Sequence, residues 1–464
     1  MKTNHWYLSS APIFSALLHL CVPMAAALIV GAVYNLINAG FIGSLHDTSM
    51  LAAVTLGSPI LGLVMAIGNV FGTGGGAMIS RLLGAAERDP AQAAQIRHVS
   101  SFAMWGSVIT GAAVGAVALL FLQPLVSLLG ADAASNSATT AFVGVMLAFV
   151  PVLAASMCLE QLVRAEGAAR QVMIGLIAST VLNLVFDVLF IIVLGWGVAG
   201  AALAMGLANL GVIVYFATWL ARNSEHMSLA PRWFTLNATV TKPVLSVGVS
   251  TLLQSAFLIV TALVLNNLAA AYGDGPLAAM GVAVRIAQVP EFLIMGITIG
   301  VLPLLAYSFG KGDRARLGSA LRGSAIAVGG VALLFSAAVW LLRDQVVGVF
   351  ITDPTVLALG ILVLTAQLVA MIANGFTGLI TSLFQATGRA LAATVMSLTQ
   401  GILFIPIVLL GNLWFGLAGI IWALTVTEVL VLVAGLVMWV VSRGAIERGL
   451  GEGSEERALA MAVE

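Results

Sequence analysis

Charged residues are scarce in this sequence. Asp, Glu, Lys and Arg make up 8% of its 464 residues and hydrophobic residues make up 61%, whereas about a quarter of an ordinary soluble domain is charged. This composition excludes a soluble protein. The 19 basic and 19 acidic residues balance to a net charge of zero, so no overall field exists that would attract nucleic acid.

Cysteine and histidine are also rare. Cys21 and Cys158 both lie inside apolar runs, and no clustered Cys and His spacing of the zinc-binding kind is present. None of the five histidines stands beside a Ser or Cys in a nucleophile motif; they are His5, His19, His46, His98 and His226. We therefore expect no disulfide, no structural metal, no cofactor and no enzymatic activity.

Two glycine patterns resemble nucleotide-binding loops but lack their context. Gly195, Gly197 and Gly200 spell GxGxxG in a short turn between two apolar runs. Gly72 and the 74–76 glycines lack the Lys and Ser or Thr of a phosphate loop. Without an ATP-binding module we expect no ATPase subunit, so any transport has to run on an ion gradient.

Long apolar runs dominate the chain instead. A bilayer core needs about 20 apolar residues per helix, and the runs do not alternate as barrel strands do. They predict an all-α membrane protein with twelve spans, at about 16–43, 51–80, 98–123, 138–163, 171–194, 199–221, 244–272, 277–308, 323–342, 355–385, 391–412 and 415–441. The first run extends too far for a removable signal peptide.

Basic residues support this count and set the orientation. Lys and Arg collect in cytoplasmic loops, and a cytoplasmic N-terminus puts all of them inside except Arg343, which falls outside, and Arg285, which lies within span eight. Six spans per half then place the C-terminus in the cytoplasm as well.

The two halves resemble each other. GVAGAALA at 197–204 is similar to GLAGIIWA at 416–423, and AEGAAR at 165–170 is placed like ATGRAL at 386–391. An even number of spans per half makes these parallel repeats, which predicts two six-helix lobes around a central cleft. The predicted parts are an N-terminal lobe at 1–221, a cytoplasmic linker at 222–243, a C-terminal lobe at 244–443 and a cytoplasmic tail at 444–464.

One intramembrane acid stands out in the first half. Asp187 lies mid-span with Asn183 and Thr180 on the same helix face. An ionisable group at bilayer depth costs about 2.5–3.5 kcal/mol and normally marks a pathway. The three oxygen-bearing side chains suit a proton or Na⁺. The alternative is a permanently protonated acid that only forms structural hydrogen bonds between helices. Asn35 and Asn38 join this cluster if spans one and five are neighbours.

The second half carries other polar candidates. Arg285 and Glu291 lie six residues apart in span eight, with Pro290 between them, and Glu428 lies deep in span twelve. We expect these groups to line the cleft. Glu160 precedes Arg164 by one helical turn, which predicts a salt bridge at the inner end of span four.

Several segments resemble the multidrug and toxic compound extrusion (MATE) transporters, over all twelve spans. The similar segments are YNLINAGFIG at 34–43, LVRAEGAARQVMI at 162–174, VLNLVFDVLF at 181–190, GWGVAGAALA at 195–204 and RIAQVPEFLIMGITIGVLPLLAYSFGKGD at 285–313. The resemblance implies a secondary antiporter that exports organic, often cationic, drugs by alternating access while H⁺ or Na⁺ enters. It also implies a bacterial inner-membrane protein, and we expect it to be monomeric.

The family's ion site carries over onto Asn183 and Asp187. Its first-span acid is Asn38 here, Met205 replaces a frequent span-six hydroxyl, and Gln254 stands where some members carry Glu. One remaining acid favours H⁺ slightly over Na⁺. The repeat offset carries Asp187 onto apolar Ile407 and Val408, which predicts coupling in the N-terminal lobe alone. Glu291, Arg285, Gln254, Glu428 and Met205 are then the expected substrate-cleft residues.

Two other functions stay open. A lipid-linked oligosaccharide flippase of the same exporter superfamily needs a basic cleft, but only Arg285 is basic at depth. A channel or receptor would make little use of a twelve-span parallel repeat.

Overall fold

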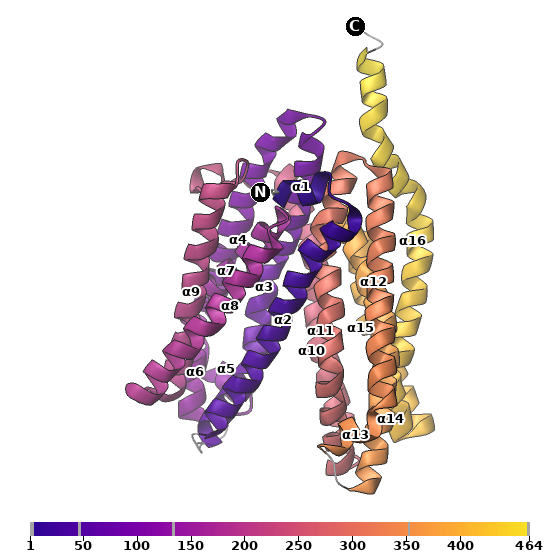
Figure 1. The fold of residues 1–464 in the computed structure, drawn as a ribbon. Coiled ribbons are helices and arrows are strands. Elements are labelled where there is room, and N and C mark those ends of the chain that lie inside the picture. The colour runs from indigo at the N-terminus through magenta and orange to yellow at the C-terminus, as the bar shows by residue number, and fades with distance from the viewer. Residues whose placement is uncertain (1–3, 45–47, 132–134, 351–352, 462–464) are drawn as a thin grey trace. The chain divides into compact units, whose positions relative to one another are not determined.

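The computed structural model describes residues 4–44, 48–131, 135–350 and 353–461, with the side chains at 35–44, 48–52, 266, 270, 274, 277 and 451–461 outside the description. Every regular element in these ranges is helical (Figure 1). The elements up to residue 233 are α1 (Asn4–Ser9), α2 (Ile13–Ser44), α3 (Thr48–Ala86), η1 (Pro90–Gln92), α4 (Ala93–Leu120), α5 (Leu122–Leu128), α6 (Asn136–Ala148), α7 (Val150–Ala165), α8 (Ala169–Asp187), η2 (Val188–Val193), α9 (Gly197–Asn223) and η3 (Pro231–Trp233). Those that follow are α10 (Ala238–Ala270), α11 (Asp274–Lys311), α12 (Arg314–Leu341), α13 (Arg343–Gly348), α14 (Pro354–Ala386), α15 (Ala390–Phe415) and α16 (Leu417–Met461).

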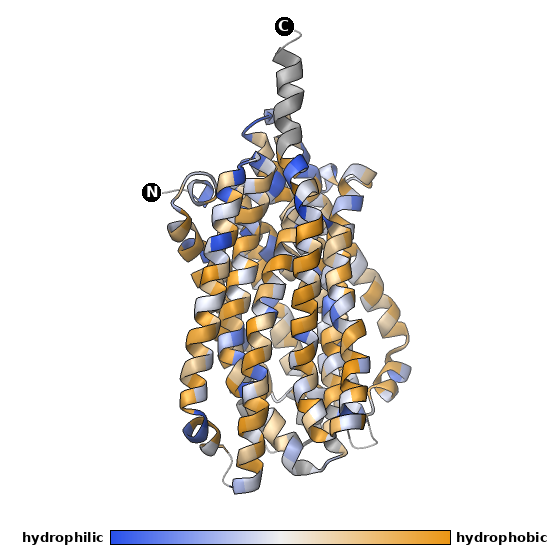
Figure 2. Ribbon diagram, turned by 90° about the vertical axis from the view of Figure 1, so that its right-hand side faces the viewer, coloured by the Kyte–Doolittle hydropathy of each residue, from blue (hydrophilic) through white to orange (hydrophobic). Residues whose placement is uncertain are grey.

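The helix pattern confirms the predicted all-α membrane protein. Among the described residues, 11 helices are long and apolar enough to cross a membrane, and the count reaches 12 when the bent pair α6 and α7 is taken as one span. Hydrophobic residues cover the middle of the long helices, and hydrophilic residues gather mostly near their ends (Figure 2). This distribution follows from the lack of hydrogen-bonding solvent in the bilayer core, where each helix satisfies its own backbone.

The bend in the fourth span has a local cause. α6 and α7 meet at an angle of 54°, and Pro151 occupies the first turn of α7. Proline has no N–H and clashes with the carbonyl four residues earlier, which favours a kink or a break in the helix at this point. The Phe149 N–H bonds to the carbonyls of Val145 and Met146 at 3.3 and 3.1 Å, which closes α6.

The chain forms two compact units that exchange parts of two helices. One unit consists of Ala26–Ser255, and the other of Met1–Ala25 together with Ala256–Glu464. The first half of α2 therefore belongs with the later helices: at Gly296 of α11, a Cβ atom would overlap the backbone of Ala25. Likewise, Gly74 of α3 lies directly against Val244 of α10. Small residues permit such close backbone approach in membranes, where van der Waals contact replaces the hydrophobic effect between helices. The lobes that we delimited by span number stay a prediction.

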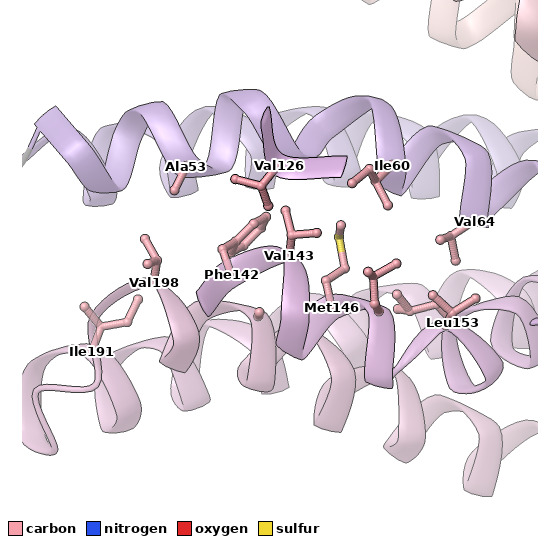
Figure 3. Packing of buried hydrophobic residues seen from close by; sticks show 13 residues of the cluster. Ala53, Ile60, Val64, Val126, Phe142, Val143, Met146, Leu153, Ile191 and Val198 are labelled. Carbon is pink, nitrogen blue, oxygen red and sulfur yellow. The ribbon is translucent and has the colours of Figure 1, made fainter. Parts of the chain in front are cut away.

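The Ala26–Ser255 unit has a continuous apolar core. Phe142, Val143 and Met146 of α6 point toward Ala53 and Ile60 of α3 (Figure 3). The rest of this cluster is Val64, Val126, Leu147, Val150, Leu153, Ile191, Val198 and Ala202. The cluster joins α3, α5, α6, α7, η2 and α9, and through Ile191 it includes η2, the segment that directly follows α8.

Candidate functional site

Asp187 lies where the helix carrying it changes its winding. It is the last residue of α8, and the chain continues without a break into the π-helical segment η2. There the Leu194 N–H bonds to the Leu189 carbonyl, five residues earlier, at 2.9 Å. A π-helical turn is wider than an α-turn and redirects the side chains around it, and such turns frequently occur at functional sites.

α8 turns its polar face toward the protein and its apolar face outward. Asn183 and Asp187 are 5% and 2% exposed, whereas Val181 and Val185 on the other side are 54% and 56% exposed. The spacing of four residues puts Asn183 directly above Asp187. In a bilayer this arrangement buries the acid and the amide among other helices and exposes the valines to lipid.

A hydrogen-bond network surrounds the two side chains. The amide orientation that satisfies its neighbours places Asn183 Oδ1 3.0 Å from the Met205 N–H, from which it accepts. Asn183 Nδ2 then donates to Asp187 Oδ2 at 2.8 Å and also to the Tyr34 hydroxyl oxygen. Three elements, α2, α8 and α9, thus meet at this amide.

The other carboxylate oxygen of Asp187 is not satisfied. Asp187 Oδ1 is buried and has no hydrogen-bond partner in the described part of the chain. An ionised carboxylate in apolar surroundings is costly unless a proton or a cation neutralises it. The arrangement can therefore accept one small positive charge at Oδ1 while Asn183 holds Oδ2. No group of three or more His, Cys, Asp or Glu among the described residues is arranged to hold a metal ion.

The polar network extends beyond the predicted residues. Asn209 Nδ2 donates to the Met205 carbonyl at 2.9 Å, and the Ser156 hydroxyl donates to Asn209 Oδ1 at 2.8 Å. These bonds link α9 to α7. Tyr34, Asn209 and Ser156 were not predicted from the sequence, although Tyr34 begins the segment at 34–43 and Asn209 lies one turn after Met205.

The remaining predicted ion-site residues are placed differently. The Thr180 hydroxyl donates to the Leu176 carbonyl of its own helix at 3.0 Å. This hydrogen bond is directed away from Asn183 and Asp187. Met205 enters the network through its backbone N–H, while its side chain packs against the apolar cluster. Asn35 and Asn38 lie outside the residues whose side chains are described.

The predicted cleft residues of the later helices fall into two classes. Gln254 of α10 and Arg285 and Glu291 of α11 have exposed side chains, and the structure shows no ion pair between Arg285 and Glu291. Glu428 of α16 is only 3% exposed. It accepts a hydrogen bond from Gln400 Nε2 of α15 at 2.6 Å.

Two further acids, Glu160 and Glu166, lie near the C-terminal end of α7. Glu160 and Arg164 form the predicted salt bridge at 3.5 Å. Glu166 lies in the loop between α7 and α8, outside the spans, and its carboxylate accepts a hydrogen bond from Ser224. Burial raises the pKa of Glu166 to about 7; the Ser224 hydrogen bond opposes this shift and the nearby charge of Glu225 adds to it.

Comparison with known proteins agrees with this architecture. The MatE family model matches residues 23–189 and 247–410. The multidrug export protein MepA of Staphylococcus aureus (strain MRSA252) is 32% identical over 433 residues, which cover 93% of this chain and 95% of that protein. MepA of Staphylococcus saprophyticus matches with the same identity and coverage. A crystal structure of MATE in the bent conformation has the same fold, with a TM-score of 0.88 and 21% identity over 97% of this chain and 99% of that chain. The chain is therefore a multi-pass membrane protein that belongs to the MatE family, whose members are membrane transporters and not enzymes.

Proposed function

We propose that this protein is a secondary active antiporter that exports organic, mainly cationic, drugs or toxic metabolites in exchange for H⁺. Family membership and the multidrug export named for its relatives support the cargo. We further propose that the protein is a monomer in the bacterial plasma membrane. The distribution of its Lys and Arg residues supports a cytoplasmic position for both termini.

One observation carries the coupling proposal: a carboxylate at membrane depth has one oxygen held by an amide and the other without a partner. In this proposal Asp187 Oδ1 takes up the proton, while Asn183 and Tyr34 hold the rest of the site. The assigned orientation of Asn183 turns its NH₂ group, not its oxygen, toward Asp187. A hard cation such as Na⁺ needs several oxygen ligands, and Asp187 is the one acid in this network among the described residues, so the site favours H⁺.

The driving force has a defined size. Each proton that moves inward down one pH unit supplies about 1.4 kcal/mol, and each 100 mV of membrane potential adds about 2.3 kcal/mol. These energies drive export only if protonation of Asp187 and substrate binding favour different conformations. The change from α-helical to π-helical winding directly after Asp187 is the element through which we propose that protonation acts.

We propose that the exposed acid Glu291 contacts the cationic substrate, and we keep Arg285, Gln254 and Met205 as candidate substrate-binding residues. Glu291→Gln then changes substrate preference while the coupling ion stays the same. A Glu291→Gln variant that still binds substrate but no longer couples to the ion gradient would overturn this assignment.

The decisive experiment measures ethidium and norfloxacin export from proteoliposomes under separately imposed H⁺ and Na⁺ gradients. Wild type is compared with Asp187→Asn and with Asp344→Asn, which makes the same chemical change at an exposed acid outside the spans. We expect a proton gradient to drive export by wild type and Asp344→Asn but not by Asp187→Asn.

Other outcomes are equally informative. Export driven by a Na⁺ gradient alone would identify Na⁺, and not H⁺, as the coupling ion. Ion-coupled export by Asp187→Asn would exclude Asp187 as the coupling site. If neither gradient drives export, the antiporter proposal fails.

A further inference from the structure

A second buried carboxyl group lies in the other compact unit. Glu428 of α16 is 3% exposed. Its Oε1 accepts from Gln400 Nε2 at 2.6 Å, and its Oε2 is buried with no hydrogen-bond partner among the described residues. The first unit shows the same local chemistry at Asp187: one oxygen held by an amide, the other without a partner.

Apolar clusters pack along α16 on both sides of Glu428, and the buried hydroxyls of Thr425 and Thr427 donate to the backbone carbonyls of Ala366 and Ala423. One turn beyond Glu428, Val431 packs with Met396 and Phe384 in one apolar cluster. In the opposite direction, Ala423 packs with Phe404 in another. Met396 and Phe404 flank Gln400 by one turn on either side, so the carboxyl–amide pair lies between two tightly packed apolar layers.

No basic group compensates the acid from the helices that pack most closely on α16. α14 and α15 contain no Asp, Glu, Lys, Arg or His within their bounds. The third packed helix, α11, carries Asp274, Arg285, Glu291 and Lys311, and Arg285 forms no ion pair with Glu428 among the described residues. A buried carboxylate without a cation beside it is costly to ionise.

The occupant of the unpartnered oxygen has to be small. Oε2 is fully buried, so an organic cation reaches it only if the packed helices separate. A hard metal cation needs several oxygen ligands, whereas Gln400 presents its NH₂ group to the carboxylate. A proton neutralises the charge and adds no volume.

We propose that Glu428 and Gln400 form a second, exchangeable proton-binding site in the unit that contains α10 to α16. In this step a hydronium ion, which needs far less room than an organic cation, transfers a proton to Glu428 Oε2; one O–H bond of the hydronium breaks, one forms at Oε2, a water molecule leaves, and release is the reverse. This inference rests on the antiport proposed above. With a second proton-binding site, each transport cycle carries two protons inward for each substrate molecule exported.

This assignment replaces two expectations from the sequence. Glu428 was expected to contact substrate, and the internal repeat predicted a single coupling acid. The repeat offset misses Glu428 because it lies in span twelve, whereas Asp187 lies in span five. The two carboxyl–amide pairs are alike in their contacts but are not repeat equivalents.

The first test measures the protonation of Glu428 directly and does not depend on transport. Dicyclohexylcarbodiimide reacts with protonated carboxyl groups in apolar sites, and peptide mass spectrometry locates the adduct. Purified protein is labelled between pH 5.5 and 9, with Glu447 as an internal control because it is ion-paired with Arg314 and Arg443 at 2.7 and 3.1 Å. We expect Glu428 to be labelled at low pH and progressively less at high pH, and Glu447 to stay unlabelled.

A Gln400→Met variant separates exchange from a structural role. It removes the donor to Oε1 and keeps the volume, so the charged form of Glu428 loses a charge-assisted hydrogen bond. The labelling midpoint should then rise by about one pH unit. Labelling that is absent throughout, or complete and independent of pH in both proteins, would overturn the proposal.

The second test counts protons. Proteoliposomes containing pyranine report H⁺ movement per ethidium exported, and we expect the ratio to fall from two in wild type to one in Glu428→Gln. An unchanged ratio refutes the two-proton cycle. If wild type shows no proton-driven export, the antiport proposal fails, and the labelling experiment still decides whether Glu428 binds an exchangeable proton.

Discussion

Glu166 allows a quantitative prediction because it lies outside the membrane and its environment is well defined. It follows the last residue of α7, and its carboxylate accepts a hydrogen bond from Ser224, the residue that ends α9. Ser224 in turn accepts from the Met227 N–H at 3.0 Å. Glu166 thus joins the loop before α8 to the linker that follows α9.

The sign of the pH effect follows from the raised pKa. Burial moves the pKa of Glu166 from 4.5 to about 7, so between these values the folded protein holds a proton that the unfolded chain releases. The free energy of unfolding therefore falls as pH rises from about 4.5 to about 7 and levels off above that. At about 1.4 kcal/mol per pH unit the loss amounts to about 2–3 kcal/mol, with some allowance for solvent screening.

Glu166→Gln removes the ionisable group and keeps an oxygen that accepts from Ser224. We expect the variant to match wild type near pH 4.5 and to exceed it at pH 8 by about 2–3 kcal/mol, or about 2–5 °C in thermal midpoint. Intrinsic tryptophan fluorescence of detergent-solubilised protein during heating measures this, and Asp344→Asn serves as an exposed control. A wild-type advantage at pH 8, or parallel pH profiles for both proteins, would show that Glu166 does not lose stability by ionising.

Other predictions test the ion site, the helix packing and the linker. Asn183→Leu removes the donor to Asp187 and should cut proton-driven export at least tenfold, measured by ethidium efflux; full activity would contradict the assigned network. Gly300→Leu places a side chain against the backbone of Leu20 and Cys21 and should lower the thermal midpoint by several degrees. Gly318→Leu is the control, because a Cβ atom there meets nothing within 4 Å, and its midpoint should stay unchanged. Equal midpoints for the two variants would contradict the close contact at Gly300. Ser101→Ala removes a 2.9 Å hydrogen bond to the Ala230 carbonyl and should cost about 1 kcal/mol, seen as faster proteolysis of the linker at 224–237; unchanged cleavage would mean that this bond does not hold the linker.

The membrane helices and their number follow from the amino-acid sequence alone. Apolar runs of spanning length predict membrane helices because lipid offers no partner for an exposed backbone, and this holds whatever the neighbours are. The same reasoning placed Asn183 above Asp187, since residues four apart share a helix face. It also predicted the Glu160–Arg164 salt bridge, which the structure contains at 3.5 Å.

The tertiary structure decided which groups meet between helices. Helical periodicity says which residues share a face but not which helix that face contacts, so Tyr34, the Met205 N–H and Gln400 were not predicted as partners. The π-helical turn after Asp187 and the division of α2 between two compact units were likewise not predicted from the sequence and are seen only in the folded chain. Burial follows the same rule: Glu428 and Glu291 are both acids within apolar runs, and only the folded chain shows that Glu428 is enclosed and Glu291 is exposed.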